Sequence, residues 1–258
     1  NAMGVGSGRR GDGSDGHSWA GGLGAIIDLA GNDEYVAGNF SLGTGYWYGI
    51  GVMWDGQGDD IYNSVYFTQA SGAHYCIGAI FDLGDGADTH LLQHNAGAGL
   101  AFGWDYTDAI FLDSGGDDHY SAKLISYGCA NIRSNAFFFE LGGNDTYDFQ
   151  AGLLGFGATD WRDDYADPGV MSPYNSYSSS VGVFLDLGGV DQYAPFPVEP
   201  NAPLDVVVPM MDNSHWQNPL PGDPHYGARN FGIGVDREGG ILWELQRWEP
   251  HQPIVATP

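Results

Sequence analysis

The chain has 258 residues, of which 43% are apolar, 14% aromatic and only 16% charged, and it contains 42 glycines. This balance excludes a disordered chain and a collagen-like one, because disorder needs few apolar residues and collagen needs glycine at every third position. The formal net charge of −25, from 33 acidic and 8 basic residues, excludes nucleic acid and anionic lipid as partners. No stretch approaches the ~20 apolar residues of a membrane-spanning helix, so no membrane insertion is expected.

Six segments share the pattern D-x-x-G-(D/N)-D-x-Y. They close at Tyr35, Tyr62, His90, Tyr120, Tyr147 and Tyr193, so the closing residues are 27, 28, 30, 27 and 46 residues apart. A degenerate copy around Asp236 ends the series. The 46-residue interval is one repeat plus an insertion of 19 residues, which we assign to 159–177. Self-similarity at this period predicts a stack of equivalent structural units.

A short apolar run precedes each first acid, as in 52–54 (VMW) and 137–139 (FFF). A column of small residues lies four positions before that acid: Gly24, Gly51, Gly78, Ala109, Ala136, Gly182 and Gly232. A second small column lies eight residues after the closing residue and indicates a sharp bend or close packing: Gly43, Ala70, Ala98, Gly128 and Gly155. Apolar runs bounded by Gly and Asp are typical of parallel strands in a stack.

The sequence therefore predicts an all-β fold, a parallel β-helix (β-solenoid) of about six to seven coils of about 27 residues. We expect a single domain over 1–258, with the repeats at about 5–193. The insertion 159–177 and an excursion at 194–229 leave the stack as loops, and 230–258 forms the last coil and a cap. Cys76 and Cys129 fall at different points of the repeat and are expected to be free thiols.

Two columns of acids mark the corner of every coil. The first comprises Asp28, Asp55, Asp82, Asp113, Glu140 and Asp186, and the second comprises Asp33, Asp60, Asp88, Asp118, Asp145 and Asp191. Carboxylates stacked ~4.8 Å apart repel by about 3 kcal/mol per pair at an effective dielectric constant near 20. Two alternatives offset this repulsion: each acid accepts N–H bonds from its own Gly-rich turn, or hard cations such as Ca²⁺ lie between the coils.

The corner resembles part of a known calcium motif. Gly31-Asn32-Asp33, Gly58-Asp59-Asp60, Gly116-Asp117-Asp118 and Gly143-Asn144-Asp145 are similar to the second half of the RTX (haemolysin-type) calcium-binding repeat. That family forms a secreted, calcium-filled β-roll, so the resemblance implies Ca²⁺ at the corner. This chain differs in repeating the motif once per ~27 residues instead of every nine. The array as a whole also resembles uncharacterised bacterial G-x-G-x-L-x-D-x-x-G-N-D-x-Y repeat proteins.

Two further features suggest contact with carbohydrate. Trp47, His74 and, displaced by one position, Trp104 form an aromatic strip that either stacks on sugar rings or fills the coil interior. The excursions carry Trp161 and Trp216 beside ionisable residues such as Arg162, Asp163, His215 and His225, and could house acid–base catalysis.

These observations predict a non-enzymatic, extracellular or periplasmic repeat module that is structural, adhesive or carbohydrate-contacting. Cations at the Asp/Gly corners would stabilise it, and a polysaccharide or cell-surface component would be its partner. The alternative is a polysaccharide lyase or glycoside hydrolase on the same scaffold, with its site under the two excursions. The sequence does not indicate an oligomeric state.

Overall fold

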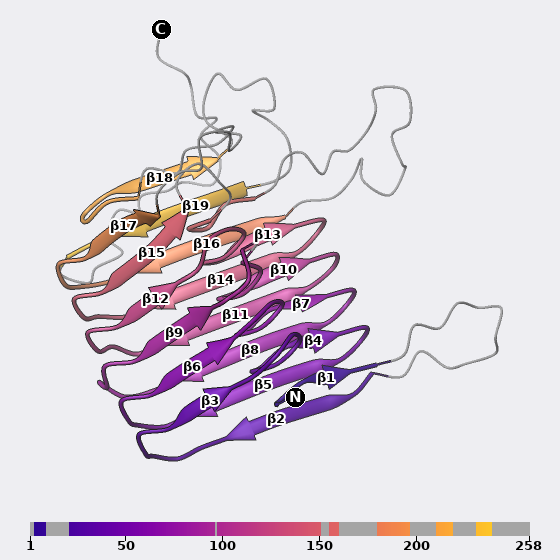
Figure 1. The fold of residues 1–258 in the computed structure, drawn as a ribbon. Helices are drawn as coiled ribbons and strands as arrows, with labels where there is room; N and C mark the ends of the chain where they lie inside the picture. The colour runs from indigo at the N-terminus through magenta and orange to yellow at the C-terminus, as the bar shows by residue number, and fades with distance from the viewer. Residues whose placement is uncertain are drawn as a thin grey trace, which may run out of the picture.

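The fold was analysed in a computed structural model of the chain (Figure 1). The structure describes residues 3–8, 21–95, 97–150, 155–159, 180–196, 210–218 and 231–238. These residues form β-strands and connecting turns with no helix among them, and the predicted all-β fold is confirmed. No helix within these ranges is therefore long and apolar enough to cross a membrane.

Three sheets run along the stack, and each complete coil contributes one strand to each sheet (Figure 1). Sheet A contains β1 (Gly6–Ser7), β4 (Gly45–Tyr46), β7 (Gly72–Ala73), β10 (Phe102–Trp104) and β13 (Cys129–Asn131). Sheet B contains β2 (Leu23–Ile27), β5 (Ile50–Asp55), β8 (Ile77–Asp82), β11 (Asp108–Asp113), β14 (Asn135–Glu140), β16 (Val181–Asp186), β19 (Phe231–Asp236) and β18 (His215–Asn218). Sheet C contains β3 (Glu34–Val36), β6 (Ile61–Ser64), β9 (Thr89–Leu92), β12 (His119–Ser121), β15 (Thr146–Gln150) and β17 (Gln192–Phe196).

The small-residue column pairs in register along sheet B. Gly24 pairs with Gly51, Gly51 with Gly78, Gly78 with Ala109, Ala109 with Ala136, Ala136 with Gly182 and Gly182 with Gly232. The residues are small because sheet A crosses close behind them: a Cβ on Gly51 would lie 2.1 Å from the carbonyl oxygen of Thr44. This register confirms the β-solenoid and the coil period on which it was based.

The apolar runs alternate between the inside and the outside of the coil. In β5, Met53 is fully buried whereas Trp54 is 42% exposed. The inward residues of successive sheet B strands stack on one another, and the rings of Phe111 and Phe138 lie 4.7 Å apart at 6°. Only every second residue of each run therefore builds the core, as the two-residue period of a strand requires.

The second predicted column does mark a sharp bend, but its register differs from our prediction. Gly43 and Ala70 align with Ala101, Gly128 and Gly157, because the backbone hydrogen bonds between coils connect these positions. All five have positive φ angles of 57° to 80°, in the left-handed region, and they make the turn that leads into sheet A. Ala98 and Gly155 lie outside this column, because a fixed count from the closing residue does not follow coils of unequal length.

One end of sheet B is covered from within the predicted excursion. Strand β18 pairs antiparallel with β19, with Trp216 opposite Gly234, whereas the other strand pairs of the stack are parallel. The described residues include only Thr159 of the predicted insertion 159–177. They include 194–196 and 210–218 of the predicted excursion 194–229, and none of the tail after 238. Cys76 and Cys129 are buried free thiols, as predicted.

Candidate metal centre

The first acid column points into the coil where sheet B ends. Side chains two residues apart lie on the same face of a strand, so an acid two positions after the buried core residue must also point inward. In β5 the core residue Met53 is followed by Asp55, which is 1% exposed. The same spacing buries Asp82, Asp113, Glu140, Asp186 and Asp236.

The second acid column lies on the other side of the same corner, directly before the sheet C strands. Asp60 precedes β6 and is two residues before Tyr62, so the carboxylate and the aromatic ring both face the interior. Asp88, Asp118, Asp145 and Asp191 are buried in the same way. Of the twelve predicted ligands, only Asp28 and Asp33 in the first coil are half-buried, because no coil covers them on one side.

Hydrogen bonds along the stack hold the second column. The backbone N–H of each second-column Asp donates to Oδ1 of the corresponding Asp in the next coil, at 2.6 Å from Asp60 to Asp88 and from Asp88 to Asp118. The ladder continues at 2.8 Å from Asp118 to Asp145 and at 2.7 Å from Asp145 to Asp191. One oxygen of Asp60, Asp88, Asp118, Asp145 and Asp191 is therefore satisfied by a neighbouring coil, not by its own turn.

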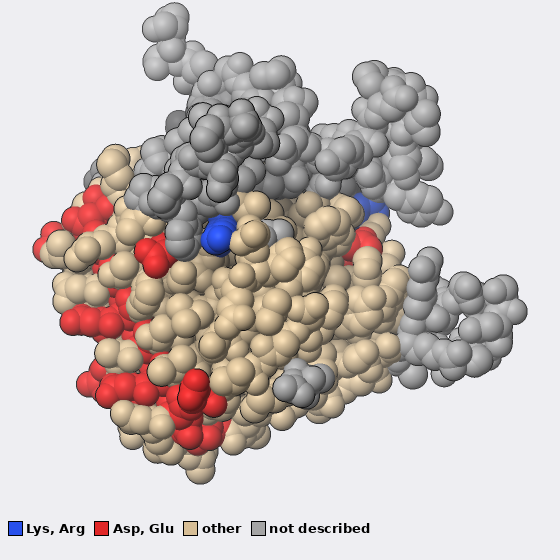
Figure 2. Space-filling view, viewed as in Figure 1, with Lys and Arg blue, Asp and Glu red and all other residues tan. Residues whose placement is uncertain are grey.

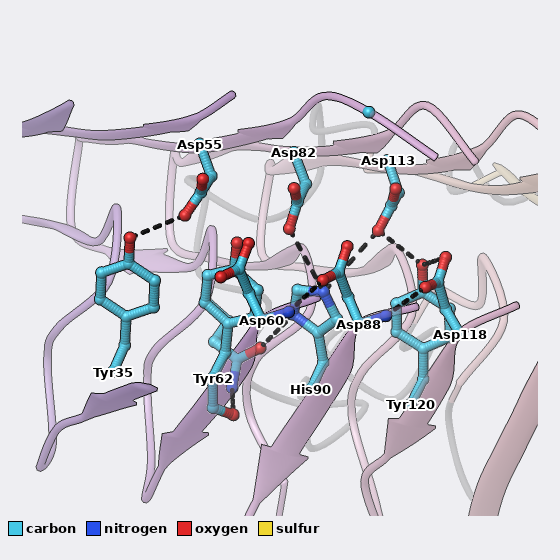
Figure 3. A network of polar contacts seen from close by, with 12 residues as sticks. Tyr35, Asp55, Asp60, Tyr62, Asp82, Asp88, His90, Asp113, Asp118 and Tyr120 are labelled. Carbon is cyan, nitrogen blue, oxygen red and sulfur yellow. Dashed lines mark hydrogen bonds and ion pairs between the residues drawn. The ribbon is translucent and has the colours of Figure 1, made fainter. Parts of the chain in front are cut away.

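The first column is held partly by its own turn and partly by tyrosines. The N–H of Gly56 donates to Oδ1 of Asp55 at 2.8 Å, which is the turn-type bond considered in the sequence analysis. The closing tyrosines stack as a column of rings, and their hydroxyls donate to first-column acids (Figure 3). These bonds are Tyr35 to Asp55 at 2.7 Å, Tyr120 to Asp113 at 2.9 Å, Tyr147 to Asp186 at 2.6 Å and Tyr193 to Asp236 at 2.8 Å. The Tyr120 hydroxyl also contacts Glu140 and has a single hydrogen, so it can donate to both acids only in turn, unless a protonated Glu140 donates to it.

Several buried oxygens remain without a hydrogen-bond partner within the described residues. Among the acids they are Oδ2 of Asp60, Asp82, Asp145 and Asp191, and Oδ1 of Asp186. The hydroxyls of Tyr62 and Ser71 and the side-chain oxygen of Asn131 are unpaired as well, and the Tyr62 hydroxyl is close enough to Asp82 to affect its pKa. A buried polar atom left unpaired costs about 1–3 kcal/mol, and more when it carries charge. The network of N–H and hydroxyl donors therefore accounts for only part of the carboxylate oxygens.

Burial shifts the titration of these acids toward the neutral form. Removal from water is the largest cause, with repulsion from neighbouring carboxylates added to it, and the pKa of Asp88 and of Asp191 rises to about 7 and that of Asp186 to about 8. The pKa values of Asp82, Asp118, Glu140 and Asp145 are raised for the same reasons. At neutral pH the buried carboxylates have lost the water that would stabilise their charge. They must therefore be either protonated or neutralised by another bound cation.

Five groups of buried or half-buried side chains bring three ligand atoms within 4.8 Å of one another and could hold a metal ion. Four of them offer only carboxylate oxygens: Asp55/Asp60/Asp82, Asp88/Asp113/Asp118, Asp145/Asp186/Asp191 and Asp191/Asp212/Asp236. The fifth, Asp82/His90/Asp113, includes a ring nitrogen. The unpaired carboxylate oxygens belong to the Asp55/Asp60/Asp82, Asp145/Asp186/Asp191 and Asp191/Asp212/Asp236 groups and, through Asp82, to the group of His90. The all-oxygen donor sets are of the kind that hard cations take.

Sequence reasoning missed three members of these groups. Asp236 belongs to the degenerate last copy and Asp212 to the excursion, so neither was included in the acid columns. His90 was identified as a closing residue but not as a ligand. Its position in a column otherwise filled by tyrosine was the feature that could have revealed it.

The predicted aromatic strip is divided between two places. Trp47 stacks on His74 at 4.3 Å, and His74 contacts Asp105 through Nδ1 at 2.7 Å. Trp104 instead lines a small pocket of about 260 Å³ with Phe40, Tyr46, Tyr66, Phe67, Ala73 and His74. Trp216 is buried in β18, and Trp161, Arg162, Asp163 and His225 lie outside the described residues.

A regular aromatic ladder lies one position further along the chain. Tyr48 stacks on Tyr75 at 5.3 Å and Tyr75 on Tyr106 at 4.4 Å, and the guanidinium of Arg133 lies 5.1 Å from the centre of the Tyr106 ring. The ladder borders an open groove of about 490 Å³ that Ile50, Ile77 and Asp108 also line. The recurrence of tyrosine at equivalent positions of three repeats was visible in the sequence, beside the Trp47 column that we selected.

In comparisons with protein-family models, curated proteins and solved structures, nothing matches this chain.

Proposed function

We propose that this chain is a non-enzymatic structural module of the cell exterior or periplasm, a β-solenoid that is stabilised by calcium ions bound inside its coils. The observation that carries the proposal is the set of buried carboxylate oxygens that face one another without a hydrogen-bond donor. The partial resemblance of the corner to the RTX repeat supports calcium as the ion and export as the setting.

The energetic need for a cation follows from the spacing of the carboxylates. Two charges within 4.8 Å repel by about 3 kcal/mol at an effective dielectric constant near 20. Several such pairs along the stack would offset most of the 5–15 kcal/mol by which a domain is ordinarily stable. A divalent cation bound to each group converts this repulsion into attraction.

Calcium and magnesium differ in the geometry that they require of an all-oxygen site. Calcium takes six to eight oxygen ligands at about 2.3–2.6 Å in flexible geometry, so two oxygens on opposite sides of it lie up to ~5 Å apart. Magnesium requires about 2.0–2.1 Å and near-ideal octahedral geometry, and it retains several waters. Separations of at most 4.8 Å admit either ion, so the choice of calcium rests on the resemblance of the corner to the RTX repeat.

A structural role agrees with the orientation of the acids. Their side chains face the interior of the coil and are held by N–H and hydroxyl donors of neighbouring coils, so a polymeric substrate at the surface would not contact them. A bound ion would instead connect acids of successive coils, as Asp82 in β8 joins Asp55 and Asp60 of the coil before it.

The test is a series of thermal melts of the full chain with calcium, magnesium or chelator at matched ionic strength. We expect calcium to raise the melting temperature most, because it binds only the folded state, which gains about 2.7 kcal/mol per site at one hundred times the dissociation constant. A difference below ~2 °C between calcium and chelator corresponds to less than about 1 kcal/mol for a chain of this size and would refute the proposal.

The pH dependence sharpens the same test. In chelator, the raised pKa of Asp88, Asp186 and Asp191 means that the folded state holds protons that the unfolded state releases. The contribution of these three acids to stability without metal is therefore fully present below about pH 4 and is lost as the pH rises from there through about 7 and 8. Because calcium needs the charged carboxylates, the melting difference between calcium and chelator should be larger at pH 8.5 than at pH 5.5. A difference that shrinks toward high pH would contradict binding at these acids.

Contact with polysaccharide is a second proposed function of the same module. The exposed ladder of Tyr48, Tyr75 and Tyr106 supports it, since flat rings spaced along a groove can stack on successive sugar rings. Asp108, which lines the groove, and Arg133, which lies beside the Tyr106 ring, can bond sugar hydroxyls.

A further inference from the structure

His90 is the one imidazole among the closing residues of the described coils. Its ring lies between two tyrosines, 4.3 Å from Tyr62 at 5° and 5.1 Å from Tyr120 at 15° (Figure 3). The side chain is fully buried. The stack therefore fixes the plane of the ring and leaves its two nitrogens at opposite sides of the tyrosine column.

Gln69 fixes which nitrogen of His90 carries the proton. Nδ1 lies 3.0 Å from Oε1 of Gln69. The amide nitrogen of Gln69 donates to the Tyr62 carbonyl, the Ser64 hydroxyl and the Leu91 carbonyl, at 3.1, 2.8 and 3.2 Å. Oε1 must therefore be the atom that faces His90, and it accepts a hydrogen bond from Nδ1–H. The lone pair of the ring is consequently on Nε2.

Nε2 points between two first-column carboxylates. It lies 3.7 Å from Oδ2 of Asp82 and 3.7 Å from Oδ2 of Asp113, and it has no hydrogen-bond partner within the described residues. These separations are too long for hydrogen bonds, which end near ~3.2 Å. They approach the roughly 3.4 Å that separates two ligands of a tetrahedral ion whose metal–ligand distances are about 2.1 Å.

We infer that His90, Asp82 and Asp113 form a buried site for a divalent transition-metal ion of the zinc class. A ring nitrogen and two carboxylates are donors that zinc-class ions accept, whereas calcium takes oxygen ligands only. Gln69 holds the imidazole from behind, as outer-shell partners of histidine ligands do. The inference shares the acid columns with the proposed function but does not need calcium at the other groups.

A matched variant replaces the proposed histidine ligand with the tyrosine that the adjacent coils carry at the equivalent position. His90→Tyr restores the tyrosine that fills this column in the coils on either side, so the stack is retained while the nitrogen ligand is lost. The control is His119→Gln: His119 pairs with Asp148 at 2.8 Å through Nε2, with side-chain exposures of 41% and 29%, so its loss leaves the interior intact.

The experiment refolds each full-length protein with excess calcium and Co²⁺, removes loosely held ions with chelator, and measures bound cobalt by mass spectrometry and by its visible d–d absorption. About one cobalt per chain is expected for the unmodified protein and for His119→Gln, and close to none for His90→Tyr. An unmodified chain that retains no cobalt overturns the inference, as does a His90→Tyr variant that retains a full equivalent.

A second variant covers the case in which His90→Tyr does not fold. Asp82→Asn keeps the shape of the side chain but removes the charge, and it should weaken cobalt retention at least ten-fold. Equal retention by Asp82→Asn and the unmodified chain would contradict the site. Calcium-dependent melting of His90→Tyr separates the two proposals, because it persists if calcium binds the all-oxygen groups and this site alone has been removed.

Discussion

Two of the three corners of each coil stack side chains by the same backbone register and differ in what surrounds them. At the corner between sheets B and C, which we call the acid corner, carboxylates and tyrosines point inward and are buried. At the corner between sheets A and B, which we call the aromatic corner, Tyr48, Tyr75 and Tyr106 stack on the outside beside an open groove. The outer rim of the acid corner also carries exposed acids, which gather along one edge of the molecule (Figure 2).

In a repeat, a residue at one position of the coil recurs in every coil, so its contribution to stability is added once per coil. An outward tyrosine repeated in successive coils becomes a ladder whose polar ends remain in water, at little energetic cost. An inward aspartate repeated in the same way becomes a line of charge that water cannot screen. Only the acid corner therefore requires donors from neighbouring coils and, on our proposal, cations.

The largest expected effect comes from the glycine that lets the acid corner stack. In Gly116→Ala the new Cβ would lie 1.7 Å from the carbonyl oxygen of Gly86, whereas in Gly142→Ala it meets nothing within 4 Å, although the φ angles of the two glycines are 151° and 153°. Both variants bear the strain of that backbone conformation, but only Gly116→Ala must also move the neighbouring coil. We expect Gly116→Ala to lose about 3 kcal/mol more than Gly142→Ala in chemical denaturation. Equal losses would mean that the coils do not stack this closely.

A smaller effect separates the inner and outer acids of one corner. Asp118 is 2% exposed and accepts the N–H of Asp88, whereas its neighbour Asp117 is exposed and accepts bonds from Asn144. Asp118→Ala leaves a buried N–H unpaired and should lower the free energy of unfolding by about 2–3 kcal/mol in calcium. Asp117→Ala should lower it much less, since water replaces the lost acceptor. Thermal melts measure both losses. Comparable losses would show that burial does not make Asp118 more important for stability than Asp117.

The smallest stability effect is expected at the aromatic corner. Tyr75 is 43% exposed, so Tyr75→Ala removes two exposed ring stacks and should cost about 1 kcal/mol. The same variant should weaken binding to a recognised soluble polysaccharide about ten-fold in affinity electrophoresis, whereas Tyr75→Phe, which keeps the ring, should retain most of it. If Tyr75→Ala binds each polysaccharide that the unmodified chain binds, and binds it equally well, then this ladder is not the contact surface.

Much of the candidate site could be predicted because the repeat places equivalent residues in register. Once Gly51 and Gly78 are known to stack, Asp55 and Asp82 must stack as well, and the columns of acids follow. Register errors arose where coils differ in length: Ala98 was aligned in place of Ala101, since the third interval has 30 residues instead of 27.

The sequence by itself determined the period, the parallel stack and the identity of the acid columns, because these depend on spacing along the chain. Tertiary structure decided which way the columns face. The two-residue alternation places Met53 and Asp55 on the same face of the strand. That face becomes the interior only because the three sheets close into a coil. Tertiary structure also decided that Asp88 accepts its hydrogen bond from a backbone N–H of the preceding coil, and that Gln69, 21 residues before His90, orients the imidazole. Contacts of this kind depend on how far the chain turns between two strands, and a linear pattern does not contain that information.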